Sequence, residues 1–445
     1  MGFRRAVLIL ILASLSQGQD SRATLTGQVS DPSGSAVPGA VVKAVHADTN
    51  VAKETQTNQT GLYTLPYLDP GTYTVNVTAS GFKDLRHAGI VLRVADRQNL
   101  PLRLELGAVT EQVTVTGEQE LIQTTTASRG LNFDPIKVQE YPLNGRQSYM
   151  LMALTPGVLF TQEQFGSSGF SGTRGWDVNG SYTINGGRTG TNQFLLNGAP
   201  ISTDGTWQVA PNVEAIQEFK VMTNTYDAQY GRSGGGHVNT TIKSGTNAIH
   251  GSLFDFWRNS LIDANATQNN RQGAPRGKRN QHQFGGVIGL PLRKDKDFLF
   301  FSFEGWREIV PFPVVASAIP AEMRNGDGFT MYNQRIYDPL TSRLCRPGID
   351  LPTCVSGGLY LRDPFPGNRL PASRISPIGK RIADLYPQPN QVGRTTVNQN
   401  FFATGSVGRY RYEQPMVRYD KVVNERDRIY GLFYFQDGSE FRNQN

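Results

Sequence analysis

Cysteine is scarce in this sequence, and so is charge. The 445 residues include only two cysteines, which excludes a scaffold held together by many disulfides and a zinc site built from four thiolates. Charged residues make up 18% of the chain, below the roughly 25% that is usual for soluble domains. The formal net charge is +7, but the basic residues are spread along the chain and do not gather in runs of about five or six. A nucleic-acid-binding surface is therefore not expected.

Long hydrophobic runs are also missing, because no apolar stretch reaches the roughly 20 residues with which a helix crosses a bilayer. The run at residues 6–15 follows Arg4 and Arg5 and precedes the small residues Ser16 to Gly18. This order is typical of a secretory signal peptide, which we place at residues 1–18. A buried first helix is the alternative interpretation. The mature chain is then either soluble outside the cytoplasm or a closed β-barrel in a membrane.

Glycine and proline, in contrast, are abundant, with 48 and 25 residues respectively. In residues 22–106 they punctuate short runs in which apolar and polar positions alternate, the pattern of half-buried strands. The runs are Leu25 to Val29, Ala40 to Val45, Gly71 to Val77 and Ile90 to Leu106. This pattern predicts a small β-sandwich of about 85 residues.

Two strings in this segment, GQVSDPSGSAVPGAVVKA and TGLYTLPYLDPGTYTVNVTASGF, resemble the carboxypeptidase regulatory-like domain, a relative of the Cna-type B repeat. The resemblance implies a prealbumin-like, carbohydrate-binding-like sandwich that serves as an accessory module. None of the five histidines begins an H-E-x-x-H helix, which excludes a zinc peptidase. The glycines Gly234 to Gly236 follow no expected buried strand and open no helix, so we do not interpret them as part of a catalytic-serine elbow, a P-loop or a dinucleotide-binding motif. We therefore expect no enzyme activity, no catalytic residue, no metal site and no cofactor.

Residues 118–247 resemble the plug of TonB-dependent outer-membrane receptors, in particular the Oar-like branch, in which the plug follows a regulatory-like domain. The resemblance rests on YPLNGR at 141–146, LTPGV at 154–158, YTINGGRTGTNQFLLNGAPI at 182–201 and VEAIQEFKVMTNTYDAQYGRSGGGHVNTTIKSGTN at 213–247. Short strands, Gly-rich turns and one short helix near Val213 to Phe219 predict a compact α+β domain. Such a domain is able to fill a wide pore.

A segment with alternating β-branched residues, 108–117, separates the sandwich from the plug-like part. Its centre is formed by Glu111, Gln112, Val113, Thr114, Val115, Thr116 and Gly117. In this position the segment resembles a TonB box, an extended periplasmic strand that adds to the TonB protein through main-chain hydrogen bonds. The resemblance implies TonB and its inner-membrane energising complex as partners. Taken alone, the segment is merely a strand, and it could belong to the preceding sandwich.

After position 247 the expected strands become rich in aromatic residues. They are Ser252 to Arg258, His282 to Leu290, Phe298 to Arg307, Met416 to Val423 and Arg428 to Gln436. In the last of these Ile429, Phe433 and Phe435 share one face, and an apolar outer face with a polar inner face is typical of a transmembrane barrel. A short turn at 424–427 and a long segment at 311–414 fit periplasmic turns and extracellular loops. Soluble sandwich strands would show the same alternation.

The strings HGSLFDFWRNSLIDA, QFGGVIGLPLRKDKDFLFFSFEGWRE, IYDPLT and PFPGNRLPASRISPIGKRIADLYPQPN resemble the beginning of the Oar-like barrel. We therefore assign residues 248–445 to the N-terminal part of an outer-membrane β-barrel. Within the long segment, helical spacing predicts a short amphipathic helix that carries Ile375, Ile378, Ile382 and Leu385. Cys345 and Cys354 lie in the same segment, and in an exported protein we expect them to form a disulfide.

The length of the chain departs from the family that it resembles. Receptors of that family have barrels of roughly 22 strands, yet the residues after 247 would supply only about nine residues for each strand, before any loop. We interpret the chain as an amino-terminal portion of a longer receptor, with an incomplete barrel.

The fold class that we predict is mainly β, with a signal peptide, a small prealbumin-like β-sandwich, an α+β plug domain and the first strands of a transmembrane β-barrel. We expect a receptor in the cell outer membrane, in contact with its lipid and with the N-terminal domain in the periplasm. It would import an unidentified solute such as an oligosaccharide, a peptide or a chelate. The alternative is a secreted or surface-attached carbohydrate-binding or adhesion protein.

Overall fold

The structure is a computed structural model that describes most of the chain after residue 20. The described residues are 21–107, 112–116, 128–160, 182–201, 210–265, 267–272, 276–311, 314–346, 349–350, 360–391, 397–403, 407–424 and 427–441. The predicted signal peptide, residues 1–18, lies outside them and stays a prediction. The chain divides into two compact units, one with residues 1–257, 281–308 and 410–439, the other with residues 258–280, 309–409 and 440–445.

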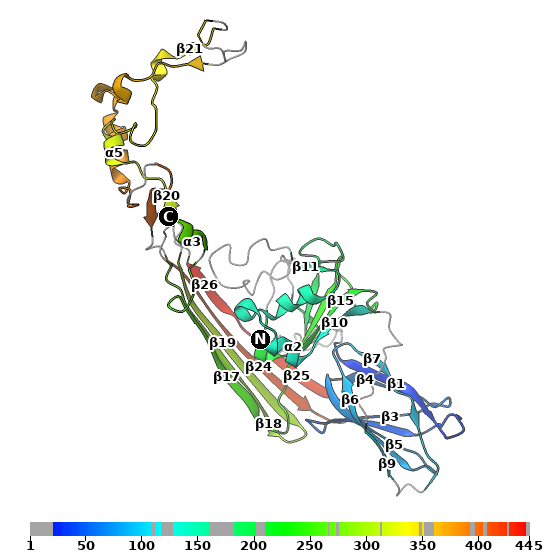
Figure 1. The fold of residues 1–445 in the computed structure, drawn as a ribbon. Coiled ribbons are helices and arrows are strands. Elements are labelled where there is room, and N and C mark those ends of the chain that lie inside the picture. Colours follow the sequence, from blue (N-terminus) through cyan, green and yellow to red (C-terminus); the bar gives the residue numbers. More distant parts are fainter. Residues whose placement is uncertain are drawn as a thin grey trace, which may run out of the picture. The chain divides into compact units, whose positions relative to one another are not determined.

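The first unit begins with a β-sandwich, drawn in blue in Figure 1. One sheet contains β4 (Leu62–Leu68), β1 (Ala23–Ser30), β7 (Arg97–Asn99) and β8 (Leu102–Arg103). The other sheet has the order β3 (Ala52–Gln56), β2 (Val41–His46), β5 (Gly71–Thr78), β6 (Asp84–Leu92) and β9 (Gln112–Thr116). Alternate side chains such as Leu25, Val42 and Val75 point inward and form one apolar core. The sandwich predicted from the alternating pattern is present.

The plug-like part of the first unit is built around a second sheet. Its order is β10 (Arg129–Phe133), β15 (Ile216–Asn224), β16 (His237–Ile242), β13 (Gln193–Leu196) and β14 (Ala199–Pro200). The smaller elements are α2 (Pro135–Glu140), η1 (Asn144–Arg146), η2 (Ser148–Leu154), and the paired strands β11 (Val158–Phe160) and β12 (Tyr182–Ile184). Rings of Phe133, Tyr149, Phe194 and Phe219 pack together in its core.

The short helix predicted near Val213 to Phe219 is wrong beyond its first residues. A single 3-10 turn, η4 (Val213–Ala215), is capped by Asn212, whose side chain accepts a hydrogen bond from the Ala215 N–H at 2.7 Å. The chain then enters β15, which pairs with β10 on one side and β16 on the other. Almost every side chain of β15 is buried, on both faces of the strand. The apolar spacing thus reflects a central strand and not one face of a helix.

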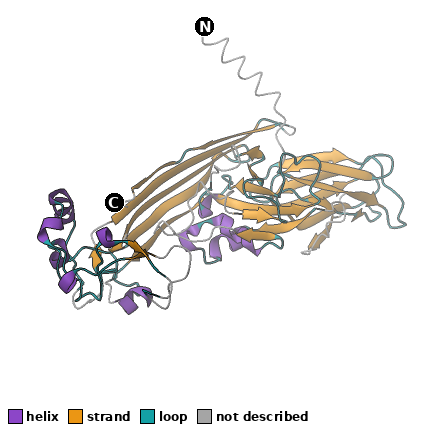
Figure 2. Cartoon of the chain, turned by 90° about the horizontal axis from the view of Figure 1, so that it is seen from above, coloured by secondary structure: helices purple, strands orange, loops and turns teal. Residues whose placement is uncertain are grey.

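The barrel-like sheet has the strand order β17 (His250–Asn259), β18 (Asn280–Arg293), β19 (Asp297–Pro311), β24 (Val407–Val422) and β25 (Arg428–Tyr434), with β26 (Asp437–Phe441) also paired to β24. All five predicted strands are present, and Figures 1 and 2 show them as long, neighbouring strands. Leu253, Ile429 and Phe433 are 91%, 62% and 63% exposed, whereas Glu304 and Gln414 are buried.

This distribution of side chains distinguishes between the two interpretations of the alternation. A soluble sandwich strand buries its apolar face and exposes its polar one. These strands expose large apolar side chains on one face, as strands that face lipid do. Their other face buries polar side chains such as Glu304 beside the apolar Phe298 and Phe300. Within the described residues no helix is long and apolar enough to cross a membrane.

The second unit contains short elements of the long segment. Strand β20 (Val314–Ala316) pairs with β23 (Phe401–Ala403), and β21 (Arg343–Leu344) with β22 (Tyr360–Leu361). Its helices are α3 (Thr267–Gln272), α4 (Ala321–Arg324), α5 (Pro377–Leu385), η5 (Pro339–Thr341), η6 (Pro366–Asn368) and η7 (Ala372–Arg374). The amphipathic helix is confirmed as α5, although Ile375 precedes its N-cap Ser376. Cys345 follows β21, but Cys354 lies outside the described residues, so the disulfide stays a prediction.

Candidate functional site

The segment that resembles a TonB box is partly described, as strand β9. Glu111 and Gly117 lie outside the described residues, and Gln112 to Thr116 form the strand. β9 runs parallel to β6, with Asp84 opposite Gln112 and Ala88 opposite Thr116. Within the described part of the chain β9 is the last strand of its sheet, so its outer edge has no strand partner there. Such an edge is a template for pairing with another chain.

The two valines of β9 have different surroundings. Val113 is half-buried and packs against the core of the sandwich, whereas Val115 is 41% exposed. The structure therefore brings the segment together with the sandwich and not with the plug. Membership of the sandwich and pairing with TonB are compatible, because an edge strand can be paired on one side and free on the other.

The loop after β6, residues 93–96, contacts β15 of the plug-like part. We call this contact the plug joint. Glu218 of β15 is 4% exposed, and its Oε1 accepts a hydrogen bond from the N–H of Val94, while its Oε2 accepts one from Asn132 Nδ2 at 3.0 Å. A carboxylate of one domain thus satisfies a buried backbone donor of the other. Buried donors without such a partner are costly.

A second pair of charged groups lies beside Glu218 in the plug joint. Lys220 Nζ is 3.1 Å from Asp96 Oδ1, and the two side chains are 10% and 3% exposed. Asp96 Oδ2 also accepts hydrogen bonds from the Arg93 N–H at 3.1 Å and from Gln98 Nε2 at 3.0 Å. The joint is completed by Ala95, which packs against the apolar residues Leu195, Met222 and Tyr230, and by an exposed ion pair between Arg97 and Asp227.

Burial raises the pKa of Glu218 to about 7. The hydrogen bonds from Asn132 and Val94 act in the opposite direction, and the negative charge of Asp96 adds to the rise. The cause that dominates is the removal of the carboxylate from water, which disfavours its charged form. Glu218 therefore titrates near neutral pH, at the contact between the sandwich and the plug-like part.

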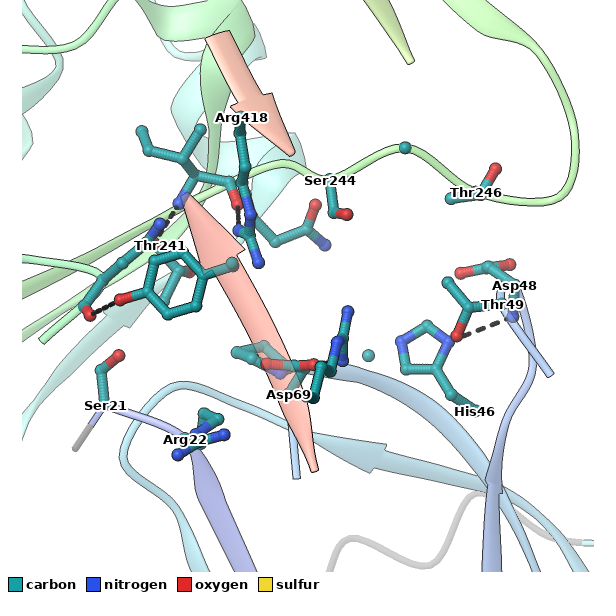
Figure 3. Close-up of a pocket in the computed structure, with 18 of the residues that line it drawn as sticks. Ser21, Arg22, His46, Asp48, Thr49, Asp69, Thr241, Ser244, Thr246 and Arg418 are labelled. Carbon is teal, nitrogen blue, oxygen red and sulfur yellow. Dashed lines mark hydrogen bonds and ion pairs between the residues drawn. The ribbon is translucent and has the colours of Figure 1, made fainter. Parts of the chain in front are cut away.

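A cavity of about 380 Å³ lies where the sandwich faces the ends of β24 and β25. We call it the rim cavity. Figure 3 shows Arg22, His46 and Asp69 of the sandwich around it, together with Arg418 of β24. Burial lowers the pKa of His46, while Asp48 acts in the opposite direction.

Two of the three arginines that line the rim cavity, Arg418 and Arg428, are paired with carboxylates. Arg418 binds both oxygens of Asp420, at 2.8 and 2.9 Å, and donates to the Ile242 carbonyl. Arg428 forms an ion pair with Asp69 of the sandwich and lies 3.4 Å from Asp420. The cavity is therefore a contact between parts of the protein and not a bare cationic site.

The YPLNGR motif supplies one further contact, between the plug-like part and the barrel-like sheet. Arg146 forms an ion pair with Glu214 and lies over the ring of Phe256, 3.9 Å from its centre. An arginine that stacks on an aromatic ring and binds a carboxylate is held on two sides. This contact joins η1 to β17.

The residues of the plug joint were not singled out from the sequence. Glu218 and Lys220 alternate with apolar residues in the string IQEFKVM, and charges two positions apart in a strand share one face. The pattern that could have identified them is this pair of charges inside an otherwise buried strand. Among the described residues no cluster of three or more His, Cys, Asp or Glu side chains is arranged to hold a metal ion.

Comparison with known proteins adds to this geometry. Residues 241–445 match the outer membrane beta barrel domain family, and residues 24–105 match the carboxypeptidase regulatory-like domain family. The TonB-dependent transporter Oar of Myxococcus xanthus is 27% identical over 314 residues, which are 66% of this chain and 27% of that protein. The chain is a homologue of the Oar TonB-dependent transporter. The resemblance carried by the sequence blocks is thereby confirmed, and so is the mainly β fold class. This Oar homologue spans about a quarter of the length of its curated relative.

Solved structures give weaker likenesses to the Oar homologue. The outer membrane transporter YddB from Escherichia coli has a TM-score of 0.39 at 10% identity, over 70% of this chain and 33% of that one. Catechol 1,2-dioxygenase from Pseudomonas arvilla C-1 has a TM-score of 0.16 at 14% identity, over 22% of this chain and 55% of that one. At scores this low neither carries an argument. The families and the relative support a transporter-like protein located in the outer membrane.

Proposed function

We propose that the receptor containing this chain imports a solute across the outer membrane with energy supplied through TonB. The observation that carries the proposal is the barrel-like sheet, one face of which exposes large apolar side chains such as Leu253, Ile429 and Phe433. A soluble carbohydrate-binding or adhesion protein is not favoured, because it would leave this apolar face in water. The proposal includes no covalent chemistry, no catalytic residue and no cofactor.

The role of β9 in this proposal is to receive TonB. TonB would add a strand to the free edge of β9 through main-chain hydrogen bonds, and would then pull on the periplasmic sandwich. The partners are TonB and its inner-membrane energising complex. The identity of the solute stays open, and the candidates are an oligosaccharide, a peptide and a chelate.

Pairing through the main chain predicts unequal effects for two substitutions of the exposed Val115. Val115→Pro removes a backbone donor and fixes φ, so it should abolish capture of the receptor by the isolated C-terminal domain of TonB. Val115→Ala keeps the backbone and is the matched control, and capture should stay within about threefold of wild type. The measurement is retention of detergent-solubilised receptor on immobilised TonB domain.

A second readout separates loss of pairing from loss of the fold. Resistance of the sandwich to a protease should be the same for both variants, because β9 is an edge strand and the other sheet does not depend on it. Undiminished capture of the Val115→Pro receptor would contradict the assignment of β9 as the TonB-contacting strand.

A further inference from the structure

The sandwich is attached to the rest of its unit by two contacts of unlike character. In the plug joint, buried apolar side chains surround the polar groups: Val94 is fully buried, and Ala95 packs on three apolar side chains. The rim contact surrounds a cavity of about 380 Å³ and includes the ion pair between Asp69 and Arg428. The two contacts should therefore differ in how much it costs to separate them.

Separation of the plug joint breaks its buried polar contacts and exposes its apolar contacts to water. Lys220 and Asp96 would lose each other, and both are at least nine-tenths buried. Glu218 would lose the N–H of Val94. Substitution of one member of the ion pair in the closed joint is strongly destabilising, because the remaining buried charge is left without compensation.

Separation of the rim contact leaves smaller deficits. Asp69 and Arg428 are 24% and 22% exposed, so water can replace each partner in part. Arg428 also keeps a second carboxylate, Asp420, at 3.4 Å. The other contact is a backbone hydrogen bond at 3.0 Å, from the N–H of Asn247 to the carbonyl of Asp48. Both of these backbone groups lie at exposed or partly exposed residues.

We propose that the sandwich and the plug form one mechanical body, and that the sandwich separates from the ends of β24 and β25 at the rim cavity. The path through the body is short. β9 pairs with β6. After Leu92, β6 leads directly into the loop that contacts β15. β15 is paired with a strand on each side in the plug sheet. A pull on β9 then reaches the interior of the plug sheet without crossing a contact to the barrel.

The consequence for transport rests on the proposed function, but the prediction that the plug joint is stronger than the rim contact does not. It can be tested without TonB and without the solute. A protease site inserted between residues 117 and 127 is cleaved in the purified, detergent-solubilised receptor, which frees the sandwich with β9 still attached. Retention of the freed sandwich on the immobilised receptor then measures the two contacts alone.

Two matched substitutions, each from aspartate to asparagine, distinguish the contacts. Asp96→Asn leaves Lys220 as an unpaired buried charge and should weaken retention by roughly 100-fold or more. Asp69→Asn removes the pair with Arg428, whose two side chains are about one quarter exposed, and should weaken retention by less than about tenfold. The wild-type sandwich should stay bound through repeated washes.

A double variant controls for damage to the fold. Asp96→Asn with Lys220→Met leaves no buried charge alone, so retention should return to within about tenfold of wild type. The proposal is overturned if the wild-type sandwich washes away, if Asp96→Asn retains it, or if Asp69→Asn releases it as readily as Asp96→Asn. It is also overturned if the double variant stays released, because the loss would then not come from the unpaired charge.

Discussion

The plug joint should weaken as the pH rises, and Glu218→Gln should remove this dependence. The pKa of Glu218 is raised to about 7 in the folded protein, chiefly by burial. A group with a raised folded pKa favours the folded state below its unfolded pKa, and this stabilisation is lost as the pH rises through the folded pKa. The joint is therefore most stable below about pH 4.5 and loses stability up to about pH 7.

The size of the effect follows from the shift. One pKa unit corresponds to about 1.4 kcal/mol, so a rise from 4.5 to about 7 amounts to about 3 kcal/mol between the two ends of the range. Glutamine fits the same place. Its carbonyl oxygen can accept from Val94, and its amide can donate to Asn132 Oδ1, a buried oxygen for which the described structure shows no partner.

Hydrogen exchange of the β15 amides, corrected for the intrinsic pH dependence of exchange, measures the prediction. The charged groups nearest to Glu218, Asp96 and Arg93, are unchanged in the variant. At pH 8 the Glu218→Gln receptor should be protected roughly 100-fold better than wild type, and at pH 4.5 the two should agree within about threefold. Equal pH dependence in both proteins would refute the assignment of a neutral carboxyl to this joint. Glu218→Ala, which leaves the Val94 N–H without an acceptor, should be less protected at both pH values.

Two further predictions concern the whole receptor. After fractionation of the native host, the protein should be recovered with outer membranes and should need detergent, because its barrel strands expose apolar side chains; recovery in the soluble periplasm would contradict the transporter proposal. Mass spectrometry without reductant should show the peptides of Cys345 and Cys354 linked, since an exported chain meets oxidants; alkylation of both thiols in the folded protein would disprove the disulfide.

The barrel strands could be predicted from the sequence because their two faces differ. Ile429, Phe433 and Phe435 recur with period two, and the structure places all three on the exposed face of the segment that contains β25. The amphipathic helix α5 was predicted for the same reason, with Ile378, Ile382 and Leu385 at helical spacing. A difference between two faces is a local property, and a local pattern can show it.

The central strands of the plug could not be identified in this way. β15 and β16 are buried on both faces, and β16 carries His237, Asn239 and Thr240 in fully buried positions. Such strands show no alternation, so spacing alone does not separate them from a helix. Some of their polar side chains bind residues far away in the chain, as Thr240 binds Tyr149.

The plug joint depends on contacts between distant segments. Glu218 and Lys220 share a strand face and would be expected in water, but the loop that ends β6 covers them, more than 120 positions earlier in the chain. For β9 the sequence predicted a strand but did not indicate the strand with which it pairs. Its parallel pairing with β6 follows from the closure of the sandwich sheet, which the residues of β9 do not determine by themselves.

Contact between β9 and TonB is the central claim, and site-specific photo-crosslinking in the native host tests it most directly. A photoreactive amino acid replaces Val115, which is 41% exposed on β9, or Leu62, which is 50% exposed on the other sheet and serves as the control. We predict that irradiation yields a covalent adduct with TonB from position 115 and none from position 62. Adducts of equal yield from both positions, or no TonB adduct from position 115 in a receptor that reaches the outer membrane, would contradict the account.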